Sequence, residues 1–235
     1  MNAIETKALT RRFGDKCAVD ALEMTVRQGE LFSLLGVNGA GKTTTIRLLS
    51  GLLRPTSGSA LLFGLPPQSQ EARRLFSLSP QETAVAGNLT VWENLELIAG
   101  IYDRSAACAA RVCTALGLDE VKRQRAKTLS GGWQRRLSIA MALASEPKLL
   151  FLDEPTLGLD VLARRELWHL IEGLKGSVTI ILTTHYMEEA EHLSDRVGIL
   201  ADGRLRTCGT PAELMAQAQT DRFEEAFVRL AGGAQ

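Results

Sequence analysis

The octapeptide GVNGAGKT, residues 36–43, constrains the fold of this chain more than any other feature. Its glycine, four residues, and then glycine, lysine and threonine have the spacing of a phosphate-binding loop. The apolar run LFSLL, residues 31–35, precedes it, and the segment after it has the apolar spacing of a helix. This order of strand, loop and helix predicts a nucleotide site in an α/β protein.

The same loop predicts which groups hold the phosphates. Glycines let successive backbone N–H groups point inward around the β- and γ-phosphates, and the following helix offers its positive end to the same anions. We expect Lys42 to meet the β and γ oxygens and Thr43 to bind magnesium. The alternative, a glycine-rich turn that matches by chance, is disfavoured by the strand and helix on either side.

The second group of interest is the pair of acids that ends LLFLDE, residues 149–154. An acid at the carboxyl end of a core strand can face the phosphate loop in a parallel sheet. We expect Asp153 to hold magnesium and Glu154 to polarise the water that attacks the γ-phosphate. Alone this pair is weak evidence, because acids often end strands and cap helices. Together with the loop it indicates hydrolysis.

Composition excludes several classes of protein. Hydrophobic residues make up 45% of the 235, which suits a globular protein, and 27 basic residues balance 27 acidic ones, so no bulk charge favours nucleic acid. The longest apolar run, residues 139–144, is far shorter than the roughly 20 residues of a membrane-spanning helix. The first residues lack the apolar run of a secretory signal, so we expect the mature chain to begin there. The cysteines lack metal-ligand spacing and are expected to be reduced thiols: Cys17, Cys108, Cys113 and Cys208.

Hydrophobic patterning predicts the remaining elements. Apolar runs at residues 149–153 and 179–184, with a helix around 164–174 between them, are typical of buried parallel strands joined by a crossover helix. Short antiparallel strands are expected before residue 26, around a turn at 12–16. Capping signals open helices at Thr90 and Thr210. We also expect strands in SGSALLFG and at 76–78, helices at 105–116 and 130–145, and a hairpin turn at Asp202 and Gly203.

Five motifs, in this order along nearly the whole chain, resemble those of the ATP-binding cassette (ABC) family. They are the phosphate loop, SPQE at 79–82, LSGGWQRR at 129–136, LLFLDEPTLGLD at 149–160 and TTHYMEEAE at 183–191. The resemblance implies a P-loop NTPase core with a mostly parallel sheet, an N-terminal antiparallel β subdomain and an inserted helical subdomain. We expect one ABC ATPase domain over residues 1–235, with the helical insertion at about 83–127 and a helical tail at about 210–235.

The resemblance assigns roles to residues that physics alone leaves open. Phe13 matches the aromatic residue that stacks on adenine, although a core phenylalanine is the alternative. Gln81 matches a glutamine that reaches magnesium and the attacking water; otherwise it is a solvated turn residue. His185 matches the histidine that contacts the γ-phosphate, whereas His169 and His192 are interpreted as structural.

Ser130, Gly131 and Gly132 match the signature that binds the γ-phosphate held by a second cassette. Physics agrees, because Ser130 can cap a long helix whose positive end an anion can approach over two glycines. An ordinary helix cap is the alternative, and Asp160, which matches an interface residue, has the same alternative. Two positions depart from the usual pattern, Trp133 where glutamine is common and Val37 where proline is common.

The predicted site is therefore composed of three sets. The ATP-binding set is Phe13, Gly36, Asn38, Gly39, Ala40, Gly41, Lys42, Thr43, Thr44, Ser130, Gly131 and Gly132. The catalytic set is Glu154, His185, Gln81 and Lys42. The metal ligands are Thr43, Gln81 and Asp153.

By resemblance, the chain is expected to bind and hydrolyse ATP with Mg²⁺ as the subunit that powers an ABC transporter. Two cassettes, identical or related, would close head to tail on ATP and reopen after hydrolysis. Separate permease subunits would hold the chain peripherally on the cytoplasmic face of the cell membrane, without nucleic acid as a partner. The style of the motifs favours exporters of drugs, lipids or polysaccharides, and small-solute import stays open.

Three alternatives remain at this point. A soluble cassette ATPase acting on ribosomes or DNA would usually have two cassettes or a long coiled coil, and this sequence has neither. A nucleotide switch that barely hydrolyses is disfavoured by Glu154 and His185. GTP is not excluded by a phosphate loop, although the guanine motif NKxD is absent from the sequence.

Overall fold

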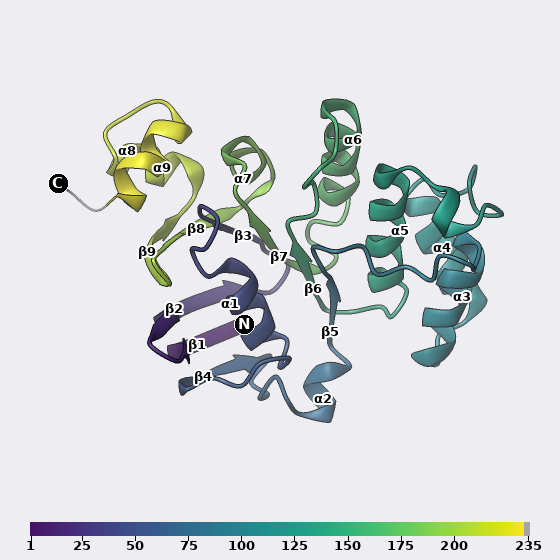
Figure 1. Ribbon diagram of the computed structural model, residues 1–235, viewed down its shortest axis with the longest axis horizontal. Coiled ribbons are helices and arrows are strands. Elements are labelled where there is room, and N and C mark those ends of the chain that lie inside the picture. Colours follow the sequence, from purple (N-terminus) through teal and green to yellow (C-terminus); the bar gives the residue numbers. More distant parts are fainter. Residues whose placement is uncertain (233–235) are drawn as a thin grey trace.

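The computed structural model describes residues 1–232, which form two sheets and the helices around them (Figure 1). The smaller sheet is antiparallel, with strand order β2-β1-β4, and consists of β1 (Asn2–Phe13), β2 (Lys16–Arg27) and β4 (Ser57–Leu62). The larger sheet has the order β5-β6-β7-β3-β8-β9, and its first five strands run parallel while β9 runs antiparallel. The predicted fold class is confirmed.

The N-terminal hairpin differs from the prediction in length. We expected short strands, but β1 and β2 each have 12 residues. Their register shifts near Ala8 and Ala21, which have φ angles of 44° and 46°. Because such bulges break the two-residue alternation of a strand, long strands look like several short ones in the sequence.

The larger sheet is covered on both faces, and its strands show this residue by residue. In β6 (Leu149–Asp153), Leu150 and Leu152 pack with the helices that follow β5, whereas Leu149 and Phe151 pack with α1 and the small sheet. The same alternation occurs in β7 (Thr179–Thr184) and β3 (Leu31–Leu35). Burial on both faces explains the uninterrupted apolar runs. The remaining strands are β5 (Phe76–Ser79), β8 (Arg196–Ala201) and β9 (Arg204–Gly209).

The helices follow the prediction in position, with shifted ends. Helix α5 (Gly131–Leu143) matches its predicted range, while α6 (Val161–Glu172) begins earlier because Asp160 caps it. The segment 83–127 contains α3 (Val91–Ile101) and α4 (Ala106–Ala115), and a short 3-10 helix (Ala126–Thr128) extends one residue beyond its end. The other helices are α1 (Lys42–Leu49), α2 (Gln70–Arg73), α7 (Met187–Leu193), α8 (Pro211–Gln217) and α9 (Phe223–Ala231).

Both predicted capping boxes are present. The Glu93 N–H donates to Thr90 Oγ1 at 3.2 Å, and the Thr90 N–H donates to Glu93 Oε2 at 2.7 Å. Thr210 and Glu213 form the same pair of bonds at the start of α8. The tail after residue 210 packs α8 and α9 on β8, and residues 233–235 of the predicted tail lie outside the described residues. In Figure 1, α8 and α9 lie at the opposite end of the molecule from α3 and α4.

The topology brings three motif segments to one edge of the larger sheet. The phosphate loop follows β3, Glu154 follows β6 and His185 follows β7, and these strands are adjacent and parallel. The carboxyl ends of adjacent parallel strands share an edge, where open α/β sheets bind ligands. Within residues 1–232, no helix is both long enough and apolar enough to cross a membrane.

Candidate nucleotide site

The phosphate loop needs glycine at its two ends for different reasons. Gly41 has a φ of 106°, and a Cβ there would lie 2.4 Å from the Ala18 carbonyl oxygen. A Cβ on Gly36 would lie 2.4 Å from the Leu200 carbonyl oxygen. Helix α1 begins directly after Gly41 and has no side-chain cap among the described residues, so its first N–H groups remain for a ligand. The loop is therefore built to bind an anion.

Lys42 is buried and held from several sides. Its Nζ donates to the carbonyl oxygens of Gly36 and Val37 at 2.8 and 3.2 Å, and it lies 3.1 Å from Glu154 Oε1. The other oxygen of this carboxylate, Oε2, lies 3.2 Å from His185 Nδ1. The Glu154 carboxylate therefore contacts both Lys42, which is predicted to bind phosphate, and His185, which is predicted to contact the γ-phosphate.

Asp153 and Glu154 face different partners. The Glu154 backbone has a φ of 48°, so the chain turns sharply between the two side chains. Asp153 Oδ1 accepts bonds from Thr183 Oγ1 at 2.5 Å and from Thr43 Oγ1 at 3.3 Å. Thr183 Oγ1 in turn accepts the Glu154 N–H at 3.0 Å. Strand β7 therefore fixes the orientation of both acids.

The donor set fits a magnesium ion. Thr43 and Asp153 place a hydroxyl and a carboxylate oxygen 3.3 Å apart beside the loop, and Gln81 lines the same pocket. Mg²⁺ prefers such oxygen ligands and usually takes one or two carboxylates together with substrate phosphates. Among the described residues, no group of three or more His, Cys, Asp or Glu side chains is arranged to hold a metal ion.

A pocket of about 440 Å³ lies at this edge of the sheet and collects most of the predicted site. The predicted residues that line it are Asn38, Gly39, Gly41, Lys42, Thr43, Thr44, Gln81, Glu154 and His185. Lys16, Ala18 and Leu157 also line it, and the sequence analysis missed them because nothing in their local pattern marks them. Gly36, Ala40 and Asp153 are buried behind the lining.

Phe13, the predicted adenine platform, lies at the end of β1 and does not line the pocket. Phe13 is 47% exposed, so it is not a core phenylalanine. The Arg11 guanidinium covers one face at 4.5 Å from the ring centroid. An exposed aromatic side chain is available to stack on a base.

The signature residues Ser130, Gly131 and Gly132 lie at the start of α5 and do not line the pocket. Ser130 occupies the N-cap position, but within the described residues its side chain makes no capping hydrogen bond. The plain capping alternative therefore does not explain this serine. For Asp160 the capping alternative holds, because its carboxylate accepts the N–H groups of Leu162 and Ala163 at 2.9 Å.

Arg135 is the main residue that the sequence analysis missed. Only 3% exposed, it donates to the carbonyl oxygens of Pro80, Gln81 and Glu154 at 2.6, 2.8 and 3.1 Å. Burial lowers the pKa of Arg135, and Asp153 and Glu189 oppose that effect by charge. The arginine repeat in LSGGWQRR was the available signal. The next arginine, Arg136, instead stacks on Trp133 and pairs with Glu166 near the surface.

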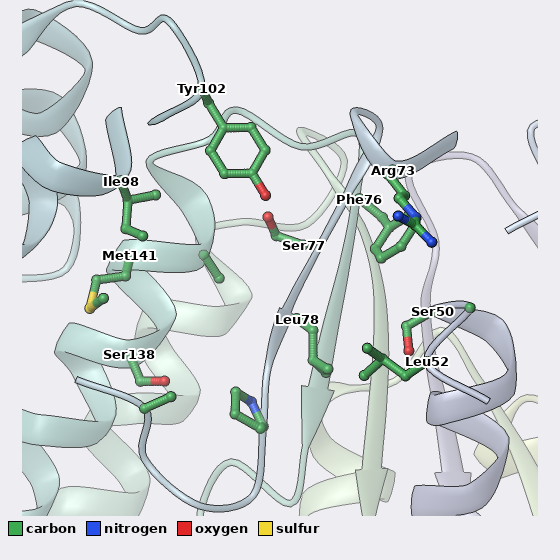
Figure 2. A pocket seen from close by; sticks show the side chains of 14 residues that line it. Ser50, Leu52, Arg73, Phe76, Ser77, Leu78, Ile98, Tyr102, Ser138 and Met141 are labelled. Atoms are coloured by element: carbon green, nitrogen blue, oxygen red, sulfur yellow. The ribbon is translucent and has the colours of Figure 1, made fainter. Parts of the chain in front are cut away.

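A second pocket, of about 500 Å³, lies between the core and the helices at 83–127 (Figure 2). Leu52, Phe76 and Leu78 come from the core side, and Ile98 and Tyr102 face them from α3 and its C-cap. Its floor includes Ser138, whose hydroxyl is 2.9 Å from that of Ser79, just before Gln81. The groove is largely apolar and adjoins the SPQE segment.

Comparison with known proteins agrees with this geometry. The family described as "ABC transporter" matches residues 19–157. A protein of Escherichia coli named "Probable multidrug ABC transporter ATP-binding protein YbhF" is 42% identical over 97% of this chain, which spans 41% of YbhF. The daunorubicin/doxorubicin resistance protein DrrA of Streptomyces peucetius is 40% identical over 90% of the chain and 66% of DrrA. Human phospholipid-transporting ATPase ABCA3 is 42% identical over 83% of the chain and 12% of its own length.

Solved structures show the same likeness. An ATP-binding subunit of an ABC transporter superposes with a TM-score of 0.86 and 30% identity, over 97% of this chain and 99% of that one. CbiO1 of Clostridium perfringens, part of the cbiONQ transporter complex, superposes with a TM-score of 0.80 and 26% identity, over 92% of this chain and 91% of its own. The fold thus matches over nearly the whole chain.

Proposed function

This chain belongs to the ABC transporter family, and from that premise we propose that it is the ATP-hydrolysing part of a membrane exporter. One observation carries the proposal: Glu154 lies between Lys42 and His185 in the phosphate-loop pocket. A carboxylate in that place can orient water in line with a γ-phosphate and accept its proton. A degenerate cassette that only binds nucleotide has no need of this arrangement.

In the proposed reaction the loop N–H groups and Lys42 bind the phosphates, while Glu154 polarises water. His185 uses Nδ1 toward Glu154, at 3.2 Å, which leaves Nε2 for the γ-phosphate. A magnesium ion held by Thr43, Asp153 and Gln81 would neutralise charge on the phosphate oxygens. When phosphate binds, Lys42 must leave Glu154 and contact the phosphate oxygens instead. The Glu154 carboxylate is then free to act on water.

The site is completed by a second cassette, identical or related. Within one chain the pocket lacks Ser130, Gly131 and Gly132, whose exposed helix start presents unbonded N–H groups. A head-to-tail pair would place each signature against the partner's γ-phosphate. Binding then closes the pair, and hydrolysis removes the contacts that hold it.

The partner is a separate permease at the cytoplasmic face of the cell membrane, and the groove in Figure 2 is where it makes contact. The groove adjoins Gln81 through Ser79, so movement there reaches the nucleotide pocket. The relatives named for multidrug transport, daunorubicin/doxorubicin resistance and phospholipid transport favour export.

The test is purification of the tagged chain from native membranes in detergent, with ATP hydrolysis measured on the product. We expect a co-purified protein with several membrane-spanning helices and Mg²⁺-dependent ATP hydrolysis. Recovery with ribosomes or DNA, without a membrane partner, contradicts the transporter role.

A further inference from the structure

Arg135 joins three carbonyl groups from two separate parts of the proposed site. It lies on α5 and is only 3% exposed. Its Nη1 donates to the Pro80 carbonyl oxygen at 2.6 Å. Its Nη2 donates to two carbonyl oxygens, that of Gln81 at 2.8 Å and that of Glu154 at 3.1 Å. One nitrogen atom therefore bridges two motif segments that lie far apart in the sequence.

This bridge depends on the shape of the guanidinium group. Its N–H donors lie in one plane and point in fixed directions, so the acceptors that bind it are held in fixed positions relative to one another. All three acceptors are main-chain carbonyls. Arg135 therefore fixes the backbone from which the side chains of Gln81 and Glu154 project.

Helix α5 holds the SPQE segment at a second point. Ser138 lies three residues after Arg135, so the two side chains share one face of the helix. The Ser138 hydroxyl is 2.9 Å from the Ser79 hydroxyl, and both serines are buried. Residues 79–81 are thus hydrogen-bonded to α5 along one helical turn, so a displacement of α5 also displaces Gln81.

The same helix begins with the signature. Ser130 is the N-cap of α5, so Arg135 lies little more than one turn from it. The Gln134 N–H donates to the Ser130 carbonyl oxygen at 2.9 Å, and the Gln134 side-chain amide donates to the Leu129 carbonyl oxygen at 3.1 Å. Regular helix therefore connects the signature to Arg135, and a ligand that moves or fixes the signature acts on Arg135 as well.

We propose that Arg135 is a positioning residue that couples the two nucleotide sites of a pair of cassettes. In the proposed pair, the signature of one chain contacts the γ-phosphate held by its partner, while Arg135 of that same chain holds its own Gln81 and Glu154. Nucleotide in the partner's site therefore sets the geometry of the chain's own site. Arg135 does not line the phosphate-loop pocket, so it acts without touching nucleotide. This inference rests on the proposed ATPase function and its head-to-tail pair.

Coupled sites make hydrolysis cooperative in ATP. Two independent sites give a Hill coefficient of about 1, and two strongly coupled sites approach about 2. We expect the original chain to hydrolyse ATP with a Hill coefficient above about 1.5. Because association of chains depends on their concentration, assays at protein concentrations about tenfold apart separate coupling within the pair from formation of the pair.

The discriminating variant is Arg135→Lys, which keeps the positive charge and replaces the planar fork by a single donor atom. We expect kcat to fall about fivefold or more and the Hill coefficient to approach about 1. The Kd of the dilute chain for ATP should stay within about twofold, because the phosphate loop is unchanged. A merely structural role would lower the thermal unfolding midpoint and the active fraction but leave the Hill coefficient as it was. An unchanged Hill coefficient in Arg135→Lys overturns the proposal.

Arg136→Lys is the matched control, since it makes the same substitution at the next position of α5. The Arg136 guanidinium stacks on Trp133 and pairs with the exposed Glu166, and it makes no bond to the carbonyls that Arg135 holds. We expect kcat within about twofold of the original and the same Hill coefficient. A loss of cooperativity equal to that of Arg135→Lys contradicts a specific role for Arg135.

Should Arg135→Lys fail to fold, Ser138→Ala decides, because it removes the other link between α5 and the SPQE segment. We expect a lower Hill coefficient than that of the original chain, and an unchanged one overturns the proposal. The original chain separates the two levels of inference. Hydrolysis with a Hill coefficient of about 1 refutes the coupling alone, whereas absence of hydrolysis refutes the proposed function and the coupling with it.

Discussion

The Glu154 carboxylate lies 3.1 Å from the Lys42 ammonium, inside the pocket where both are expected to act on a γ-phosphate. Both side chains are largely buried, so the pair is poorly screened by solvent. Phosphate and carboxylate therefore compete for one cation. A bound γ-phosphate would therefore have to displace Glu154 from Lys42.

Lys42→Ala should abolish useful nucleotide binding. It removes the cation for the phosphates and leaves Glu154 buried without it, and truncating a buried charged partner costs about 2–5 kcal/mol, or on the order of 100-fold in affinity. Titration with a fluorescent ATP analogue measures this loss. Lys7→Ala, on the exposed side of β1, is the control and should bind normally. Binding by Lys42→Ala at the original affinity contradicts the assigned role.

Glu154→Gln should keep ATP binding and lose hydrolysis. The amide no longer accepts a proton from water, so turnover is expected to fall about 100-fold or more. Light scattering after size exclusion should then show an ATP-bound dimer, because the closing contacts are never removed. Glu120→Gln, exposed in the turn that follows α4, should behave as the original. A chain that stays monomeric at saturating Mg–ATP with turnover blocked refutes the dimer mechanism.

Arg135→Met should destabilise the fold as well as the site. Three carbonyl oxygens, of Pro80, Gln81 and Glu154, lose a buried donor, which we expect to cost about 2–4 kcal/mol. The free energy of unfolding, measured in urea, tests this loss of stability. Arg136→Met is the neighbouring control, because its pair with the exposed Glu166 contributes under about 1 kcal/mol. Equal losses of unfolding free energy in both variants would contradict a specific contribution from the three carbonyl contacts.

Glu189 should make stability depend on pH in a direction opposite to most acids. Its pKa in the folded chain is raised above 4.5 by burial, so above that pH the unfolded chain releases a proton that the folded chain keeps. The folded state therefore loses stability as pH rises from 4.5 toward the folded pKa, by at most about 1.4 kcal/mol per pH unit. We expect the free energy of unfolding of Glu189→Gln, measured in urea between pH 5 and 7, to rise relative to that of the original chain as the pH increases. Parallel curves contradict this.

Leu52→Asp should weaken permease binding. Leu52 is 68% exposed at the rim of the groove in Figure 2, so the change should leave the thermal unfolding midpoint nearly unaltered. A charge in an apolar interface should reduce co-purified permease about tenfold or more. Val228→Asp, equally exposed on α9 at the far end of the molecule, is the control. Full recovery of the permease with Leu52→Asp places the contact elsewhere.

Much of the architecture was predictable because its signals are local. The capping boxes at Thr90 and Thr210 marked helix starts, since the donor and acceptor lie three residues apart. Buried strands such as LLFLD were predictable from their unbroken apolar runs. The long N-terminal strands were not, because bulges near Ala8 and Ala21 interrupt the alternation.

By itself the sequence determined the phosphate loop, the acids after β6 and the family, since each depends on residues that are neighbours in the chain. Only the tertiary structure decided that Glu154 joins Lys42 to His185 and that Arg135 holds the Gln81 segment. These contacts join segments far apart in sequence, and their geometry is set by how strands and helices pack. The residue pattern of a single segment therefore does not predict this geometry.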